Sequence, residues 1–522
     1  MREKIHFYIY LAGLCLIAFF LPLSEFIISA AIFMLLTNWF AELNFKTKFK
    51  RLFEDKSVLI FLLIFFVHII WLINTHNFGY ALKDIRIKLP LLALPVIFAT
   101  SFKLNYKQIY LICVFFIFGV LISSVVGVLM HHRELFSQGD FNVRQLSVFI
   151  SHIRLSLMSS FSIMLIIYFW AKKIFITNIY LKIFSFTILL WFLIFLGLVE
   201  GFTGIFALLT AGIFVILLKG FYSKNINSKI AFISLGVLIP VISFWGVFNE
   251  IRHFYKPTAD NTLLEVTAGG NNYFHDTTVC MLENGNPVYI NICEKELHWA
   301  WAKRSNVGLD KTDSKGNPIL HTLIRYLASK GLPKDAEAVL SLHDEDIMNI
   351  ENGITNYRFA QPKIISDRVY KIIWQLDYYL KGGNPSGHSL SQRIEYLKYG
   401  LILSYRYFFN GTGTGDIDDA FKALYIEKKS ELEPQFRHRT HNQFITFFAS
   451  FGVFGFLLII IGMFYPIFKN LENLNWSFFS FMIIIILSMF SDETLETATG
   501  VAFFSFFYCL FIWGRENQVE NK

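Results

Sequence analysis

The chain has 522 residues, of which 54% are hydrophobic, 18% aromatic and only 16% charged. This composition, with repeated apolar runs of about 17 residues or more, excludes an ordinary soluble protein and indicates many membrane spans. The formal net charge is +8, and because the basic residues border the apolar runs, it indicates anchoring on anionic lipid and argues against a nucleic-acid partner.

Twelve apolar runs are candidate membrane spans, and we expect an all-α polytopic membrane protein with about 12 transmembrane helices. The runs cover about residues 7–22, 24–40, 57–73, 88–102, 106–130, 153–171, 181–199, 203–218, 230–248, 442–468, 476–490 and 497–513. An even number of spans places both termini on one side. Lys and Arg are far more frequent in the short segments of that side, which the positive-inside rule assigns to the cytoplasm.

The longest polar segment then lies outside the membrane, between spans nine and ten. It is nearly neutral, contains Trp299, Trp301 and Trp374, and has a turn sequence at Asn284-Gly285. We therefore expect a large, mainly helical periplasmic loop domain and not a linker. The expected divisions are 1–248 for spans one to nine, 249–440 for the loop domain, and 441–522 for spans ten to twelve with a cytoplasmic tail.

Cys280 and Cys293 flank the turn in the loop domain. They are not in simple hairpin register about it, so the sequence leaves open whether they form a disulfide.

Arg393 sits beside an apolar stripe formed by Leu390, Ile394, Leu397 and Leu401. This spacing predicts an amphipathic helix on or against the membrane face. Arg393 could simply extend its charge to the interface. Alternatively, it could grip a diphosphate bidentately, because guanidinium geometry matches phosphate oxygens.

Three glycines alternate in the turn Gly411-Thr412-Gly413-Thr414-Gly415, which Asp416 follows. Alternate glycines allow a sharp turn or a close approach of the backbone to an anion. No Lys-Ser/Thr pair follows at the spacing of a Walker loop. The sequence is compatible with both a structural turn and a phosphate cradle.

Histidines and arginines precede the tenth span in the sequence Arg437-His438-Arg439-Thr440-His441-Asn442. A histidine with an ordinary pKa near ~6.5 can exchange protons in the periplasm, but hydrogen bonding at the interface is the simpler role. His438 and His441 have a spacing that could bind metal, yet no acidic or thiol partner is close in sequence. We therefore expect no metal.

Cationic and histidine side chains from distant segments share the outer face in this topology. They are Arg86, Lys88, His152, Arg154, Arg393 and His441. Each alone could be an interface residue, but their joint placement favours a site for a polyanion. Glu200 and Asp492 lie on the same face and could orient a base or an arginine.

At these residues the chain resembles the O-antigen ligase and O-antigen polymerase superfamily. The resemblance rests on the hydropathy plan and on five segments: Gln392-Arg393-Ile394-Glu395-Tyr396, Gly411-Thr412-Gly413-Thr414-Gly415, His441-Asn442-Gln443-Phe444, His321-Thr322-Leu323-Ile324-Arg325-Tyr326 and Ile350-Glu351-Asn352-Gly353. Phe451-Gly452-Val453-Phe454-Gly455 supplies the glycines that trail the His-Asn signature. The last two of the five segments look like those of Bacteroidetes-type members.

The resemblance implies a multi-pass protein of the bacterial inner membrane whose active site faces the periplasm. The donor would be a glycan on undecaprenyl diphosphate, transferred with inversion and without metal, cofactor or nucleotide sugar. Arg393 would hold the diphosphate and His441 would assist the acceptor hydroxyl. His438, Asn442, Gly413, Gly415 and His152 would support them.

One departure from the family concerns its second arginine. Many members have a Ser-Arg-Thr-Gly pattern where this chain reads Gly201-Phe202-Thr203-Gly204. Arg154 or Arg86 would then supply the second cation, and Arg154 is the favoured one.

The leading hypothesis is an O-antigen ligase that transfers the glycan to a lipid A–core sugar. An O-antigen polymerase or a protein O-oligosaccharyltransferase would share these features, with a growing glycan or a protein as acceptor. A transporter of lipid-linked sugars predicts ionisable residues near the middle of spans, and the predicted spans are nearly free of them.

Overall fold

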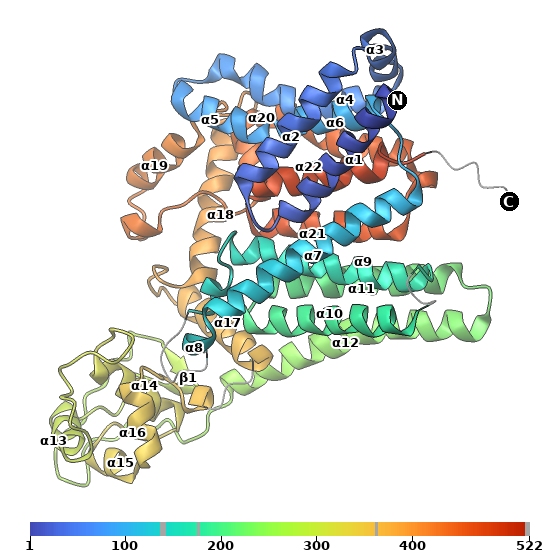
Figure 1. Ribbon diagram of the computed structural model, residues 1–522. Helices are drawn as coiled ribbons and strands as arrows, with labels where there is room; N and C mark the ends of the chain where they lie inside the picture. The colour runs from blue at the N-terminus through green and yellow to red at the C-terminus, as the bar shows by residue number, and fades with distance from the viewer. Residues whose placement is uncertain (136–141, 175–177, 361–363, 517–522) are drawn as a thin grey trace. The chain divides into compact units, whose positions relative to one another are not determined.

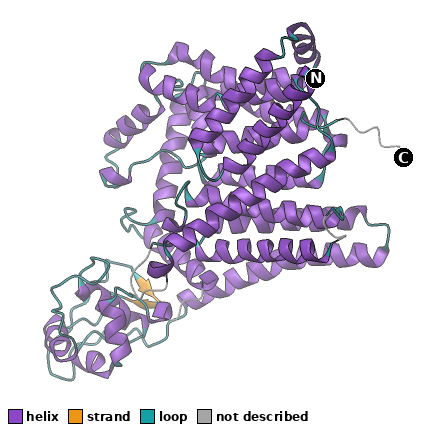
Figure 2. Ribbon diagram, viewed as in Figure 1, coloured by secondary structure: helices purple, strands orange, loops and turns teal. Residues whose placement is uncertain are grey.

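The computed structural model describes the 522-residue chain except for residues 136–141, 175–177, 361–363 and 517–522. The described residues are mostly helical, and their sheet consists of one short antiparallel pair, β1 (Leu282–Glu283) and β2 (Asn286–Pro287) (Figure 2). The chain forms two compact units. The first comprises Met1–Gly236, Tyr396–Ser430 and Arg437–Lys522, and the second comprises Val237–Glu395 and Glu431–Phe436.

The first unit is a helical bundle (Figure 1). Its helices are α1 (Arg2–Phe20), α2 (Glu25–Ala41), α3 (Phe45–Glu54), α4 (Lys56–Ile70), α5 (Phe78–Lys88), α6 (Pro90–Thr100), α7 (Tyr106–Met130), α8 (His132–Leu135), α9 (His152–Ala171), α10 (Ile179–Leu198), α11 (Phe202–Tyr222), α19 (Ile417–Glu427), α20 (Gln443–Lys469), α21 (Trp476–Ser491) and α22 (Ala498–Ile512). Short 3-10 turns are η1 (Trp71–Asn74), η2 (Val143–Leu146), η5 (Leu471–Asn473) and η6 (Thr494–Glu496). The division between the units falls within two further helices, α12 (Ile226–Tyr255) and α18 (Ser389–Arg406).

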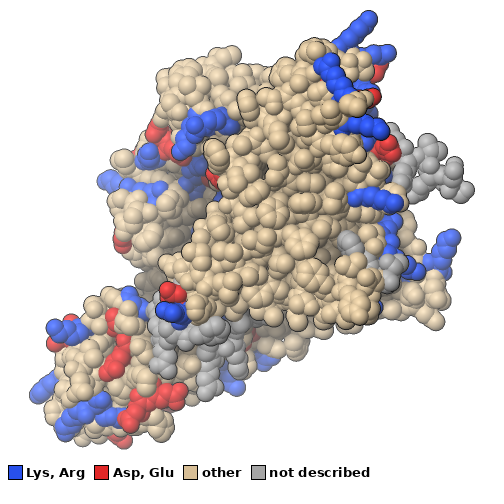
Figure 3. Space-filling view, in the orientation of Figure 1, with Lys and Arg blue, Asp and Glu red and all other residues tan. Residues whose placement is uncertain are grey.

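Eight helices among the described residues are long and apolar enough to cross a membrane, and α2 with α3 makes a ninth if that pair, bent by 113°, is one span. Each of the twelve apolar runs contains a helix, which confirms an all-α, multi-pass architecture. The shortest, α6, has 11 residues, so a total of twelve spans stays a prediction. Figure 3 shows a broad surface of the first unit without charged side chains, as contact with lipid requires.

Helix α22 is buried along its length from Thr499 to Ile512. Its Phe503 and Phe507 meet Phe161 of α9 and Phe481 of α21, with ring centroids 4.9–6.0 Å apart. Each such pair contributes about 0.5–1.5 kcal/mol beyond its buried area. Because lipid is as apolar as these rings, close packing and not removal from water holds the helices together. This packing fixes where α22 begins, next to the candidate site.

Helix α20 is interrupted at Gly452, whose backbone (φ 60°, ψ −172°) is not helical. In an unbroken helix the Val453 amide would donate to the Ala449 carbonyl. Here the Val453 amide donates to the Phe408 carbonyl (2.7 Å), and the Ala449 carbonyl accepts from the Thr412 amide (2.9 Å). The break therefore lets a neighbouring turn join the helix through its backbone.

The glycine turn Gly411–Gly415 is that neighbour. The Gly413 amide donates to the Ser450 carbonyl (2.9 Å), and the Gly415 amide donates to the Thr75 hydroxyl (3.3 Å). A Cβ on Gly413 would lie 2.4 Å from the Asn74 carbonyl oxygen, so the close approach is between backbones. The amides of Gly413 and Gly415 are thus engaged within the protein, and this geometry favours the structural turn over the phosphate cradle.

The second unit has its own core around Trp301, Tyr326 and Tyr370. Its helices are α13 (Glu294–Arg304), α14 (Ile319–Ser329), α15 (Ala336–Ser341), α16 (Asp344–Glu351) and α17 (Ile364–Leu380), with 3-10 turns η3 (Tyr357–Ala360) and η4 (Pro434–Phe436). Buried Glu283 of β1 accepts hydrogen bonds from Arg325 (2.6 Å) and Asn356 (2.7 Å). Cys280 is exposed, Cys293 is buried, and both are free thiols.

Gly452→Ala should destabilise the protein, because the backbone at Gly452 is accessible essentially to glycine alone, at a cost of about 1–3 kcal/mol. The added Cβ would also lie 2.2 Å from the Phe409 carbonyl oxygen. Thermal unfolding of the purified protein in detergent measures the effect. Gly212→Ala is the matched control, since nothing lies within 4 Å of its added Cβ; equal melting temperatures for the two variants would contradict the role of the break.

Candidate functional site

An acidic loop, Asp492–Thr497, joins α21 to α22 and contains Asp492, Glu493 and Glu496. Asp492 ends α21 in an extended conformation, and Thr497 caps α22 by accepting from the Gly500 amide (3.3 Å). The loop contacts the segment that enters α20 and the first turn of α9. The loop's carboxylates therefore meet the cations of two other segments at one end of the bundle.

His441 has a left-handed backbone, with φ of +47°, which is uncommon for a histidine. The next residue, Asn442, fixes the start of α20: its side-chain oxygen accepts from the Phe444 and Ile445 amides, each at 3.1 Å. Asn442 also donates to the Phe490 carbonyl (3.2 Å). Asn442 thus acts as a helix cap that holds His441 in place.

The His441 ring contacts an acid and an aromatic ring. Its Nδ1 lies 3.3 Å from Asp492 Oδ1, and the Tyr396 ring of α18 lies 5.4 Å away between centroids. A hydrogen bond from Nδ1–H to the carboxylate leaves Nε2 as the acceptor in a neutral ring. The His441 side chain is 37% exposed, so the arrangement offers an oriented base to an external hydroxyl.

Arg154, in the first turn of α9, contacts the other oxygen of the same carboxylate. Its Nη2 lies 3.9 Å from Asp492 Oδ2, and its Nη1 donates to the Ser151 hydroxyl (3.0 Å). Within the described part of the chain, its buried Nε has no hydrogen-bond partner. The Glu25 carboxylate also interacts electrostatically with the Arg154 guanidinium. A guanidinium carries five donor hydrogens. The buried Nε does not reach a ligand, but Nη2 is beyond hydrogen-bond distance of Asp492, so Arg154 keeps donor capacity for an anion.

Asp492 bridges the histidine and the arginine. Burial by itself would raise the pKa of Asp492, but the hydrogen bond from His441 and the charge of Arg154 bring that pKa below its ordinary value. Asp492 is therefore ionised at neutral pH. One carboxylate orients the base and partly neutralises the arginine, which leaves a positive excess when the histidine takes up a proton.

Arg439, only two residues before His441, has a different environment. It contacts Glu493 (3.0 Å), Glu496 (3.5 Å) and Asp418 (3.3 Å), and it donates to the Tyr80 hydroxyl (3.0 Å). Burial opposes its charge, but the surrounding carboxylates raise the pKa of Arg439 above its ordinary value. Its donors are engaged by the protein, so Arg439 is structural.

Lys88, at the end of α5, is completely buried. Its ammonium lies 2.7 Å from Asp84 and 3.2 Å from Glu496. The same Glu496 accepts from Gln443 (2.9 Å) at the start of α20. Lys88 therefore joins α5, α20 and the acidic loop and is not available to a ligand.

Four candidates from the sequence remain: Arg86, His152, His438 and Arg393. Arg86 is exposed on α5, and His152 is half-buried at the start of α9. The His438 ring lies 6.1 Å from the His441 ring and 5.9 Å from Tyr396. Burial and the nearby His441 lower the pKa of His438. Arg393 is half-buried on α18, three residues before Tyr396, in the part of that helix that belongs to the second unit.

The segment Gly201–Gly204 packs directly on the helix that carries Arg154. A Cβ on Gly201 or Gly204 would lie 2.6 or 2.8 Å from atoms of Ser156, and the Ser160 hydroxyl donates to the Gly204 carbonyl (2.8 Å). The glycines thus bring the start of α11 against α9. The resemblance leads us to expect an arginine at the start of α11. In this chain the arginine near that place is Arg154 of α9, two residues before Ser156, which contacts Gly201 and Gly204.

The sequence analysis named Asp492 but missed the pairing of Glu493 and Glu496 with Arg439 and Lys88. Two signals were available: Asp84 and Lys88 are spaced to pair on one helix turn, and Asp492, the neighbour of Glu493, was expected on the same face as Lys88. Tyr396 gave no signal, because its contact with His441 depends on how α18 packs.

The fold and this arrangement define a multi-pass helical membrane protein with a paired-charge cluster at one end of its bundle. Among the described residues, no group of three or more His, Cys, Asp or Glu could hold a metal ion. The sequence matches no model of a known protein family, and no curated protein matches it.

Lys88→Met should destabilise the protein by about 3–5 kcal/mol, because removing one partner leaves buried Asp84 and Glu496 without their shared cation. Thermal or denaturant unfolding in detergent measures the change. Lys83→Met, at an exposed position of the same helix, should stay within about 0.5 kcal/mol of wild type. Similar stability of both variants would show that Lys88 does not hold the cluster together.

Proposed function

We propose that the protein is a glycosyltransferase that moves a glycan from undecaprenyl diphosphate to a hydroxyl acceptor at the periplasmic face of a bacterial inner membrane. The observation that carries the proposal is the His441–Asp492–Arg154 arrangement, which combines an oriented base with an arginine that has free donor capacity. The resemblance to O-antigen ligases supports a lipid A–core sugar as acceptor.

In the proposed reaction, His441 Nε2 takes the proton of the acceptor hydroxyl as its oxygen attacks the anomeric carbon. The bond from that carbon to the phosphate oxygen breaks, and undecaprenyl diphosphate leaves with the electron pair. Attack opposite the leaving group inverts the anomeric centre. Asp492 keeps the Nδ1–H tautomer in place and stabilises the imidazolium that forms.

The leaving group is already activated, so placing the donor and neutralising phosphate charge account for much of the proposed catalysis. Arg154 is assigned to the diphosphate because its donors are incompletely used, whereas those of Arg439 are engaged. Arg393 is assigned to the diphosphate from the sequence resemblance alone. Exposed Arg86 is the alternative to Arg154.

His441→Ala should lower kcat by about 10²–10⁴-fold, which is the usual contribution of general-base assistance. The measurement is transfer of glycan from undecaprenyl diphosphate by purified protein in detergent or nanodiscs. His132→Ala, at an exposed histidine of α8, is the control and should keep wild-type kcat. Unchanged kcat in folded His441→Ala protein would remove His441 from the mechanism.

Arg154→Gln should weaken donor binding by about 10–100-fold, because a hydrogen bond to a charged group is worth about 1.5–3 kcal/mol. Arg154→Lys should stay impaired, since an ammonium cannot reproduce the guanidinium fork. Arg144→Gln, at an exposed site, is the charge-matched control. If Arg154→Gln binds the donor as tightly as Arg144→Gln does, the diphosphate-binding role moves to Arg86. The donor affinity of Arg393→Lys, compared with the same control, tests the role of Arg393.

A product assay tests the proposal itself and its acceptor. Purified protein is given an undecaprenyl-diphosphate glycan and rough lipopolysaccharide, and the products are separated on a gel. Transfer without a change in glycan length would establish a ligase. A ladder formed from single-repeat donor without lipid acceptor would instead identify a polymerase, and product only with a protein acceptor would identify an oligosaccharyltransferase. No product under any condition would overturn the proposal.

A further inference from the structure

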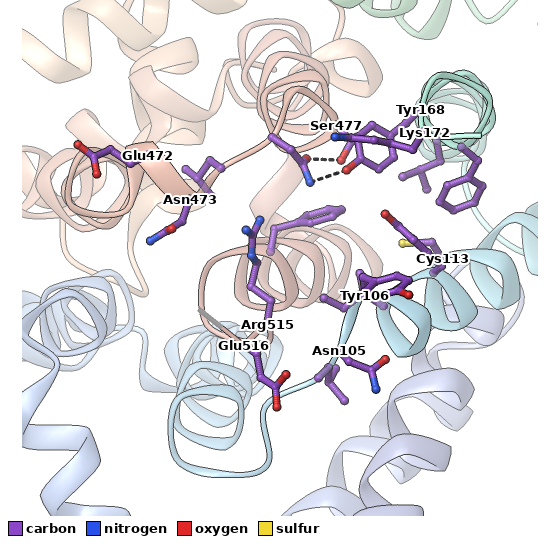
Figure 4. A pocket seen from close by; sticks show the side chains of 18 residues that line it. Asn105, Tyr106, Cys113, Tyr168, Lys172, Glu472, Asn473, Ser477, Arg515 and Glu516 are labelled. Carbon is purple, nitrogen blue, oxygen red and sulfur yellow. Dashed lines mark hydrogen bonds between the residues drawn. The ribbon is translucent and has the colours of Figure 1, made fainter. Parts of the chain in front are cut away.

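Figure 4 shows a pocket of about 410 Å³. It lies at the opposite end of α9 and α21 from His441. It is bounded by the start of α7, the end of α9, the start of α21 and the segment after α22. Helix directions place it at that opposite end, since α9 begins near Arg154 and α21 ends at Asp492. No residue of the proposed transfer site lines it.

The lining of this pocket has an apolar part and a polar part. Cys113, Leu165 and Phe511 are buried apolar residues of the bundle. The phenols of Tyr106, Tyr110 and Tyr168 form the aromatic part of the lining. Tyr106 and Tyr110 have ring centroids 5.9 Å apart, and Tyr110 and Tyr168 have theirs 6.5 Å apart. The pocket therefore suits a ligand with a polar group attached to an apolar chain.

Asn475 links two other residues of the polar part of the lining, Tyr168 and Ser477. Its amide nitrogen donates to the Tyr168 hydroxyl (3.0 Å), and its oxygen accepts from the Ser477 hydroxyl (2.5 Å), as the dashed lines in Figure 4 show. These bonds hold Tyr168 of α9 against the start of α21. Internal hydrogen bonds thus position the polar part of the lining at Tyr168, Asn475 and Ser477.

Two cations line the pocket. Lys172 ends α9 and is exposed. Arg515 is fixed by backbone pairing, because the Leu104 amide donates to the Gly514 carbonyl (2.7 Å) and the Glu516 amide donates to the Leu104 carbonyl (3.1 Å). Arg515 is close enough to the phenols of Tyr110 and Tyr168 for its charge to interact electrostatically with them. Within the described ranges of the chain, neither Lys172 nor Arg515 forms an ion pair.

Two carboxylates also line the pocket. Glu472 and Glu516 are both exposed to solvent. In Figure 4 they lie toward the edge of the lining, whereas the Arg515 side chain reaches toward its middle. The interior of the pocket is therefore cationic and phenolic, a combination of donors that phosphate oxygens accept.

We propose that this pocket binds the phosphate-bearing headgroup of a phospholipid from the leaflet at this end of the protein. Arg515 and Lys172 would contact the phosphate, the phenols of Tyr106 and Tyr110 would donate hydrogen bonds, and the apolar part of the lining would meet the start of the acyl chains. A lipid is the source favoured over a free phosphate ester for two reasons. The lining is half apolar, and this end of the spanning helices carries other basic residues, such as Lys103, Lys107 and Lys219, that attract anionic lipid.

The test is native mass spectrometry of the purified full-length protein, with phosphatidylglycerol titrated in detergent. Wild type should retain one tightly bound lipid, and Lys172→Gln/Arg515→Gln should bind it at least about tenfold more weakly, since two charge-assisted hydrogen bonds are lost. Lys173→Gln/Lys182→Gln removes the same charge from exposed positions outside the pocket and should bind like wild type. Lys172→Gln alone, at an exposed residue, should weaken binding without affecting folding.

Soluble glycerol 3-phosphate distinguishes the two sources of phosphate. It should not displace the bound lipid at concentrations near that of the lipid, because it lacks the acyl chains. Displacement at equal concentration would overturn the lipid assignment. Equal lipid retention by the pocket variants and the Lys173→Gln/Lys182→Gln control would overturn the site. Neither readout depends on glycan transfer, so the result stands apart from the proposed function.

Discussion

The pairing of buried charges at one end of the bundle is the interaction on which the rest of the first unit depends. Taking an ion out of water costs several kcal/mol unless an opposite charge and hydrogen bonds compensate. The acidic loop Asp492–Thr497 meets this requirement for cations that arrive from three segments, because Asp492 contacts Arg154 and His441, Glu493 contacts Arg439, and Glu496 contacts both Arg439 and Lys88. The end of α5 and the starts of α9 and α20 therefore meet at this loop. The full burial of α22 in turn fixes the loop's position.

The same cluster separates structural cations from those that can act on a ligand. Arg439 and Lys88 together contact four carboxylates, of which Glu496 contacts both, and they have their donors engaged. Arg154 shares a single carboxylate with His441 at a longer distance, and its Nε lacks a partner among the described residues. A charge count alone treats these cations as equivalent. Because Arg154 has donors that the protein does not engage, Arg154 and His441 are the groups that we assign to the proposed transfer. With Asp492 they supply its base, its orienting acid and one cation.

Much of the fold was predictable, because hydropathy depends on local composition. All twelve apolar runs contain helices, and the helix through Arg393 was expected from its apolar stripe. The candidate site was predictable only in part. His441 and Arg154 were named, and Asp492 was named as a group that could orient either one. The pairing of Glu493 and Glu496 was missed, and the glycine turn was left between two roles. The Gly413 amide donates to the Ser450 carbonyl of α20, next to the break at Gly452, and the Gly415 amide donates to the Thr75 hydroxyl after η1. No local pattern reveals these partners, because both acceptors lie far away in the chain.

The sequence by itself determined the class of the protein: a multi-pass helical membrane protein with ionisable groups gathered at span ends. Hydrocarbon leaves so few alternatives for a polar backbone that apolar length alone decides this. Tertiary structure decided which ionisable groups are paired and which keep donors for a ligand. It also decided that Gly201 and Gly204 bring α11 against the helix of Arg154, and that tyrosines from α7 and α9 meet Arg515 in a second pocket. These outcomes depend on contacts of a few ångströms between segments far apart in the chain, and spacing along one segment carries no information about them.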